Sequence, residues 1–125
     1  MCQLVVKLNL DTRQWTIEET GTFSNYIDVS FGFSANTKPI TFNNLSFGII
    51  LQNGSDIVYH STFPKAGVFY KSTDSDYIEL FRIEDIVKNT QYDITLWAEN
   101  DALKSQTKYI LTTPNIFTFN DYEVV

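Results

Sequence analysis

The stretch of sequence that decides the fold is residues 86–100, which read IVKNTQYDITLWAEN. The side chains that alternate with more polar ones along its second half are Tyr92, Ile94, Leu96 and Ala98. A period of two is typical of a strand with one buried face. The pattern therefore predicts a strand over 92–98 whose outer face carries Trp97.

The same alternation recurs along most of the chain. The predicted strands cover residues 4–10, 14–18, 27–33, 45–51, 57–59, 77–83, 92–98 and 108–113, with an edge strand near 68–70. Asn53-Gly54 predicts a hairpin with a type I′ turn, because both central residues of that turn need positive φ. Only residues 83–87 suggest a helix, of a single turn. Short strands separated by turns predict an all-β sandwich or barrel.

Composition limits the possible function classes. The chain has 125 residues, enough for one domain with its own core, and 43% of them are hydrophobic. Its formal net charge is −6, and its Lys and Arg residues are scattered singly. Such a chain repels a phosphate backbone, so we expect no nucleic-acid partner. With Cys2 as its single cysteine, it cannot form an intrachain disulfide.

The sequence also has no targeting or membrane signal. No apolar run approaches the length of a membrane span, and residues 1–7 are too short and too polar for the apolar region of a signal peptide. We therefore expect no membrane insertion and no export by the general secretion route.

Residues 86–100 resemble the E–F corner and F strand of fibronectin type III domains. That family has Leu, Pro, Thr and Tyr at every second position, followed by two aliphatic residues, an Ala and an Asn. The matching residues here are Ile86, Thr90, Tyr92, Ile94, Leu96, Ala98 and Asn100, while Lys88 stands in place of the usual Pro. The resemblance implies a tyrosine corner, with the Tyr92 ring buried and its hydroxyl bonded to the upstream backbone.

This resemblance extends over about residues 23–114. The family's B-strand Trp is missing, and Phe31 or Phe33 is expected to fill its space. The implied fold is a fibronectin type III-like, or immunoglobulin-like, Greek-key β-sandwich over 23–114. An extra N-terminal β-hairpin is expected in 1–22 and a C-terminal interaction tail in 115–125, all within one domain.

No pattern in the sequence indicates catalysis. His60 is the only histidine, and Cys2 has no base near it in sequence. Asp74 and Asp76 could bind calcium but lack the other ligands and the Gly of an EF-hand loop, so a solvated loop is the preferred interpretation. Glu18-Glu19 and Glu99-Asn100-Asp101 are interpreted in the same way. We therefore predict a protein that is not an enzyme and that needs no metal or cofactor.

Two features predict interaction surfaces. Trp97 points outward, with Tyr70, Tyr77 and Trp15 as further exposed candidates, unless the N-terminal hairpin covers them, which is the preferred interpretation. The tail is too apolar for a free terminus, and its candidate contact residues are Phe117, Phe119, Tyr122 and Val124. It either packs on its own sandwich or docks on a neighbour, for example by adding a strand to an exposed edge.

Fibronectin- and immunoglobulin-like modules recur in the tails, baseplates and capsid decorations of bacteriophages. The resemblance therefore implies a non-enzymatic structural or attachment component of a homomeric or mixed assembly, in a tailed-bacteriophage virion assembled in the host cytoplasm. The alternative is a carbohydrate-binding or adhesion module that recognises a cell-surface glycan through exposed aromatic residues.

Overall fold

The structure is a computed structural model that describes residues 2–10, 12–34, 40–71, 76–99 and 104–116, and for residues 40–45, 64–71 and 76–78 it describes the backbone alone. The described residues form eight strands. These are β1 (Cys2–Asn9), β2 (Trp15–Gly21), β3 (Ile27–Ser34), β4 (Ile40–Asn53), β5 (Asp56–Lys71), β6 (Asp76–Ile83), β7 (Gln91–Glu99) and β8 (Lys104–Thr112). The described part contains no helix long and apolar enough to cross a membrane.

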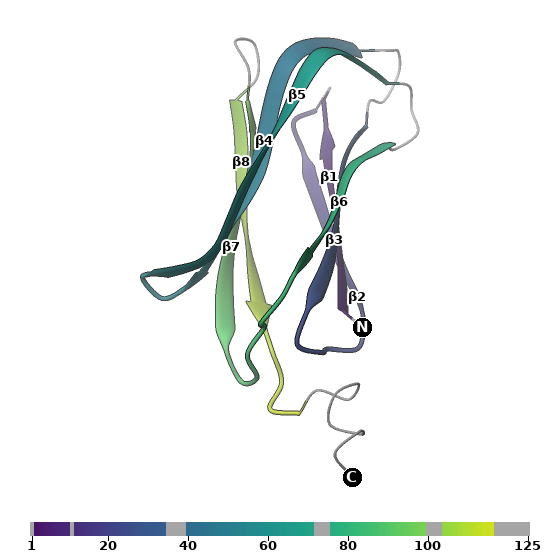
Figure 1. Ribbon diagram of the computed structural model, residues 1–125. Coiled ribbons are helices and arrows are strands. Elements are labelled where there is room, and N and C mark those ends of the chain that lie inside the picture. Colours follow the sequence, from purple (N-terminus) through teal and green to yellow (C-terminus); the bar gives the residue numbers. More distant parts are fainter. Residues whose placement is uncertain (1, 11, 35–39, 72–75, 100–103, 117–125) are drawn as a thin grey trace.

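The strands form two sheets that face each other (Figure 1). The first sheet has the order β2-β1-β3-β6, and the second sheet has the order β5-β4-β7-β8. The predicted all-β class is confirmed, and the arrangement is that of a β-sandwich. The alternation of apolar and polar residues also predicted the bounds of four strands to within two residues, namely β1, β3, β6 and β7.

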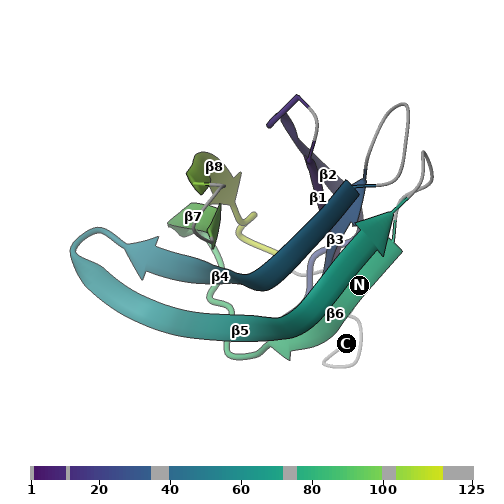
Figure 2. The ribbon, with the colours of Figure 1, turned by 90° about the horizontal axis from the view of Figure 1, so that it is seen from above.

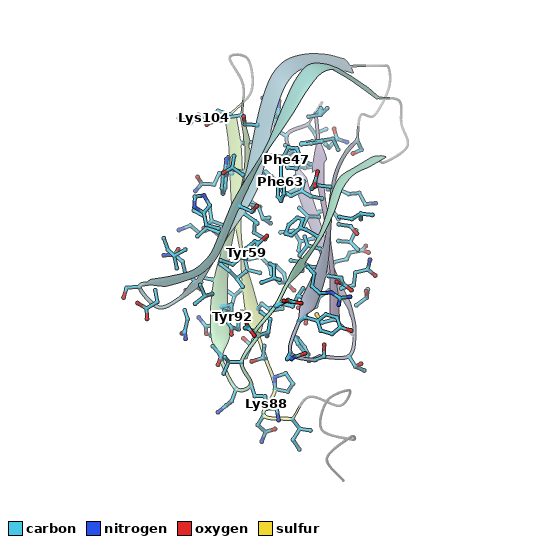
Figure 3. The ribbon with its side chains drawn as sticks, in the orientation of Figure 1. Phe47, Tyr59, Phe63, Lys88, Tyr92 and Lys104 are labelled. Carbon is cyan, nitrogen blue, oxygen red and sulfur yellow. The ribbon has the colours of Figure 1, made fainter. Side chains whose placement is uncertain are left out.

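The core lies between the sheets and follows from the period of two. On β7 the residues Tyr92, Ile94, Leu96 and Ala98 are buried, as predicted. At the centre, the Phe47 ring lies 4.8 Å from Phe31 and 5.3 Å from Phe33 between ring centroids. Figure 3 shows Phe47 pointing from β4 toward the first sheet. These three rings are fully buried, and each contributes roughly 1.5–3 kcal/mol through its removal from water.

The N-terminal hairpin is built into the first sheet. β1 pairs antiparallel with β2 and parallel with β3, so it lies between them. Arg13 takes a φ of 64° in the connecting turn, and the Asn9 N–H donates a 2.9 Å hydrogen bond to the Gln14 carbonyl. The inner residues of β1 are core residues, namely Cys2, Leu4, Val6 and Leu8.

The β4–β5 ribbon is longer than predicted. β4 begins at Ile40 rather than residue 45, and β5 is one continuous strand where separate strands at 57–59 and 68–70 were expected. Pro64 lies within β5, opposite Ser46 of β4. β5 is an edge strand with β4 as its neighbour, and a proline at an edge can leave its missing N–H on the unpaired side. Figure 2 shows this ribbon curving from the second sheet toward β6.

The type I′ turn predicted at Asn53-Gly54 is wrong. The hairpin turn is centred on Gly54-Ser55, because Asn53 pairs with Asp56. A positive φ at Gly54 alone, of 62°, is the pattern of a type II′ turn rather than type I′.

The segment that follows β6 is also not the helical turn that was predicted. Residues 84–90 have no helical structure. Asp85 and Asn89 adopt φ values of 59° and 51°, which a right-handed helix excludes.

Candidate interaction surfaces

Tyr92 organises the loop between β6 and β7. Its side chain is buried, and its hydroxyl accepts a 2.9 Å hydrogen bond from the Val87 N–H. In this bond between Tyr92 and the upstream backbone, the hydroxyl oxygen is the acceptor. Ile86 is buried beside it, and its N–H donates a 2.9 Å bond to the Asn25 carbonyl. Tyr92 lies at the lower end of the second sheet in Figure 3.

Thr113 fixes the same loop from the end of β8, and sequence reasoning gave it no role. Its buried hydroxyl donates a 2.7 Å bond to the Val87 carbonyl and accepts a 2.9 Å bond from the Thr90 N–H. The Thr90 hydroxyl in turn donates a 2.8 Å bond to the Lys88 carbonyl. The available signal was the Thr113-Pro114 pair at the end of the last predicted strand.

This loop and the residues after β8 form one end of the sandwich, which we call the corner end: Val58, residues 84–89 and residues 114–116. The two segments are joined by a 2.8 Å bond from the Asn89 N–H to the Pro114 carbonyl. Val87 is 58% exposed, Val58 51% and Ile116 59%. A depression of about 340 Å³ at this end is lined by Leu51, Val58, Ile83, Glu84, Asp85, Ile86 and Tyr92. The corner end therefore presents apolar side chains to solvent.

Trp97 projects from the outer face of the second sheet, as predicted. It is half-buried and lies across Gly48, its partner residue on β4. The His60 ring on β5 is 5.8 Å from the indole between centroids. Because β1 and β2 belong to the opposite sheet, the N-terminal hairpin does not cover Trp97.

Trp15, one of the further candidates for an exposed aromatic residue, is half-buried. Its ring packs edge-on against Phe31 at 5.8 Å, and its Nε1–H donates a 2.9 Å hydrogen bond to Ser105 Oγ on β8. Farther along the same two strands, the Tyr109 hydroxyl donates a 2.6 Å bond to Glu19 Oε2. These contacts join the edge strands β2 and β8 across the open side of the sandwich.

The opposite side of the sandwich is closed by aromatic rings. Phe81 of β6 lies 4.9 Å from Phe63 and stacks at 6.2 Å on Tyr59, both of β5. Figure 3 shows Tyr59 and Phe63 on the ribbon that runs past β6. Both sides of the sandwich are therefore held together by side chains that reach between the sheets.

The remaining candidates do not form a site among the described residues. His60 is exposed and Cys2 is a buried free thiol. Burial, and next the nearby Glu19 charge, raise the pKa of Cys2 to about 11, so the thiol stays protonated. In the part of the chain that the structure describes, no three His, Cys, Asp or Glu side chains are grouped to hold a metal ion.

Several predicted residues lie outside the side chains that the structure describes. They are Tyr70, Asp74, Asp76, Tyr77, Asn100, Asp101, Phe117, Phe119, Tyr122 and Val124. The described candidate surfaces are thus the corner end and the outer face of the second sheet. No protein-family model, curated protein or solved structure matches the chain.

Proposed function

We propose that this protein is a non-enzymatic structural or attachment subunit of a multi-subunit assembly, in a tailed-bacteriophage virion. In this proposal, the domain has a fibronectin type III-like Greek-key sandwich fold. The pairing of β3 with β6, and the order β5-β4-β7-β8, support that assignment, because they match the B–E pair and the C′-C-F-G sheet of such domains. The bond between Tyr92 and Val87 supports it as well. Since one fold serves many functions, the functional part rests on the surfaces.

The observation that carries the proposal is the apolar corner end. Val58, Val87 and Ile116 each expose more than half of their surface there. Ile116 leads directly into the tail that carries Phe117 and Phe119. Covering apolar surface stabilises a complex by roughly 25 cal/mol per Å², so a neighbouring subunit seated on this end would gain from each of these side chains.

The experiment is a measurement of solution mass by light scattering, with and without residues 117–125. We expect the intact chain to form a defined multimer and the shortened chain to be a monomer. Because the deletion starts beyond β8, the shortened chain should keep the circular dichroism spectrum of the intact chain, which excludes unfolding as the cause. Equal masses for the two forms would count against the proposal.

A further inference from the structure

The outer face of the second sheet places side chains in rows across its four strands. In one row, Trp97 of β7 stands between Gly48 of β4 and Gln106 of β8, and Thr62 of β5 lies beyond Gly48. A Cβ atom at position 48 would lie only 2.6 Å from Cη2 of the indole. The missing side chain is therefore what allows the indole to lie over β4.

The indole is both held in place and accessible. Its inner side rests on the backbone of β4, and the His60 ring lies beside it. Because Trp97 is only half-buried, its accessible surface must be on the side away from the sheet. An aromatic face carries partial negative charge, and it attracts the partially positive C–H groups that form the apolar face of a pyranose ring.

The surroundings of the indole are polar. Thr62 and Gln106 flank it in its own row, and each has groups that hydrogen-bond to hydroxyls. In the two adjacent rows, Glu99 lies opposite Lys104 and Lys108 lies opposite Thr95. This surface therefore has no excess of negative charge, unlike the chain as a whole, whose net charge is −6.

A depression adjoins the indole on the β8 side. Its volume is about 280 Å³, slightly below the roughly 300–1,000 Å³ typical of small-molecule sites. It is lined by Trp97, Ala98, Glu99, Lys104, Ser105 and Gln106. The lining holds one negative and one positive side chain, so the depression itself has no net charge. An apolar platform, surrounding hydrogen-bonding groups and a charge-balanced depression match a neutral saccharide.

We propose that Trp97, with Gln106, Thr62 and the Glu99–Lys104 pair around it, binds a sugar ring of a neutral saccharide by stacking. The inference rests on the proposed attachment function, for which the saccharide is the target on a cell surface. Gly48 is a positioning residue, because it lets the indole lie in the stacking orientation.

The test is an NMR titration of the ¹⁵N-labelled full chain with cellohexaose, chitohexaose, maltohexaose and a mannohexaose. The indole N–H signal of Trp97 reports on the proposed site, and a backbone signal distant from it supplies the internal control. The Trp97 signal should shift with saturation for at least one of these saccharides, while the backbone N–H signal of Val87, which is bonded to Tyr92 at the corner end, stays in place. We expect an affinity in the range of about 0.1–10 mM.

Three variants test whether the indole and its position determine the affinity for the saccharide. Trp97→Ala should weaken binding about tenfold or more, and Trp97→Tyr should keep part of the affinity. Gly48→Ala, which retains the indole but displaces it, should also weaken binding. Ile110→Ser is the control, because Ile110 is exposed on the same face of the sheet two rows from Trp97 and should leave the titration unchanged.

Two results would overturn the inference. One is the absence of a saturable Trp97 shift with all four saccharides, and the other is unchanged affinity in Trp97→Ala. If Trp97→Ala instead alters the mass of the assembly, the indole contacts a protein subunit. That result would contradict the saccharide site and leave the proposed assembly supported. If a saccharide binds to a chain that is a monomer with and without residues 117–125, the result would contradict the proposed assembly and support the saccharide site.

Discussion

The hydroxyl of Tyr109 on β8 donates a 2.6 Å hydrogen bond to Oε2 of Glu19 on β2, and it thereby links the two sheets at one side of the sandwich. Burial, followed by this hydrogen bond and the charge of Glu19, raises the pKa of Tyr109 to about 12. The neutral phenol is therefore the form that the folded protein favours.

Stability should accordingly decline at alkaline pH through Tyr109. Its pKa is higher in the folded protein than the value of about 10 in an unfolded chain, so the contribution is complete below pH 10 and is lost as the pH rises toward 12. Tyr109→Phe should lower the free energy of unfolding at neutral pH by about 0.5–1 kcal/mol, a small value because the pair is partly solvated. Urea unfolding across this pH range measures both effects. A Tyr109→Phe variant that lost stability as steeply as the native chain between pH 10 and 12 would contradict the assignment.

Tyr92→Phe should destabilise the fold by about 1–3 kcal/mol, because it leaves the Val87 N–H without its acceptor. The measurement is urea unfolding at neutral pH. Tyr59→Phe is the matched control, since that substitution keeps the stacking of its ring on Phe81. Equal stability of Tyr92→Phe and the native chain would show that the corner bond contributes nothing.

Gly48→Ala should cost about 1–3 kcal/mol through overpacking. The new Cβ would stand 2.6 Å from Cη2 of Trp97, with Cζ2 of the same ring also in contact, and 2.5 Å from the Ser61 carbonyl oxygen. In a Trp97→Ala background the cost should shrink without vanishing, because the Ser61 carbonyl remains. A double-mutant cycle with thermal or urea unfolding measures this coupling. Full additivity of the two changes would mean that the indole does not lie over Gly48.

The Cys2 thiol should not react with a disulfide reagent in the native protein near neutral pH. It is buried, and its pKa of about 11 leaves almost no thiolate. Reaction should appear only when urea unfolds the chain, with a midpoint that coincides with the loss of circular dichroism. Rapid labelling of the folded chain would contradict the burial of β1 in the core.

The sequence predicted those features of the fold that are local. A period of two along residues 92–98 correctly placed Tyr92 inside and Trp97 outside, because neighbouring side chains on a strand point to opposite faces. It did not predict that β1 pairs in parallel with β3, since strand pairing depends on contacts between distant segments. The links from Trp15 to Ser105 and from Glu19 to Tyr109 each join residues 90 apart, beyond the reach of any local pattern.

The same limit explains the errors in the turns and at the candidate sites. Asn53-Gly54 indicated a hairpin correctly, but the pairing of Asn53 with Asp56 moved the turn centre by one residue. Sequence reasoning identified Trp97 as a surface residue yet missed its contact with Gly48, which exists only because of the register between β4 and β7.

The solution mass of a Val87→Asp, Ile116→Asp double variant tests the central claim most directly. These residues are 58% and 59% exposed at the corner end, and Ile110, 60% exposed on the outer face of the second sheet, supplies the control Ile110→Asp. A charge at each position adds little cost to the isolated fold but opposes burial against a neighbour. The account predicts a multimer for the native chain and for Ile110→Asp, and a folded monomer for the double variant. A double variant with the same mass as the native chain would show that the corner end is not the contact surface.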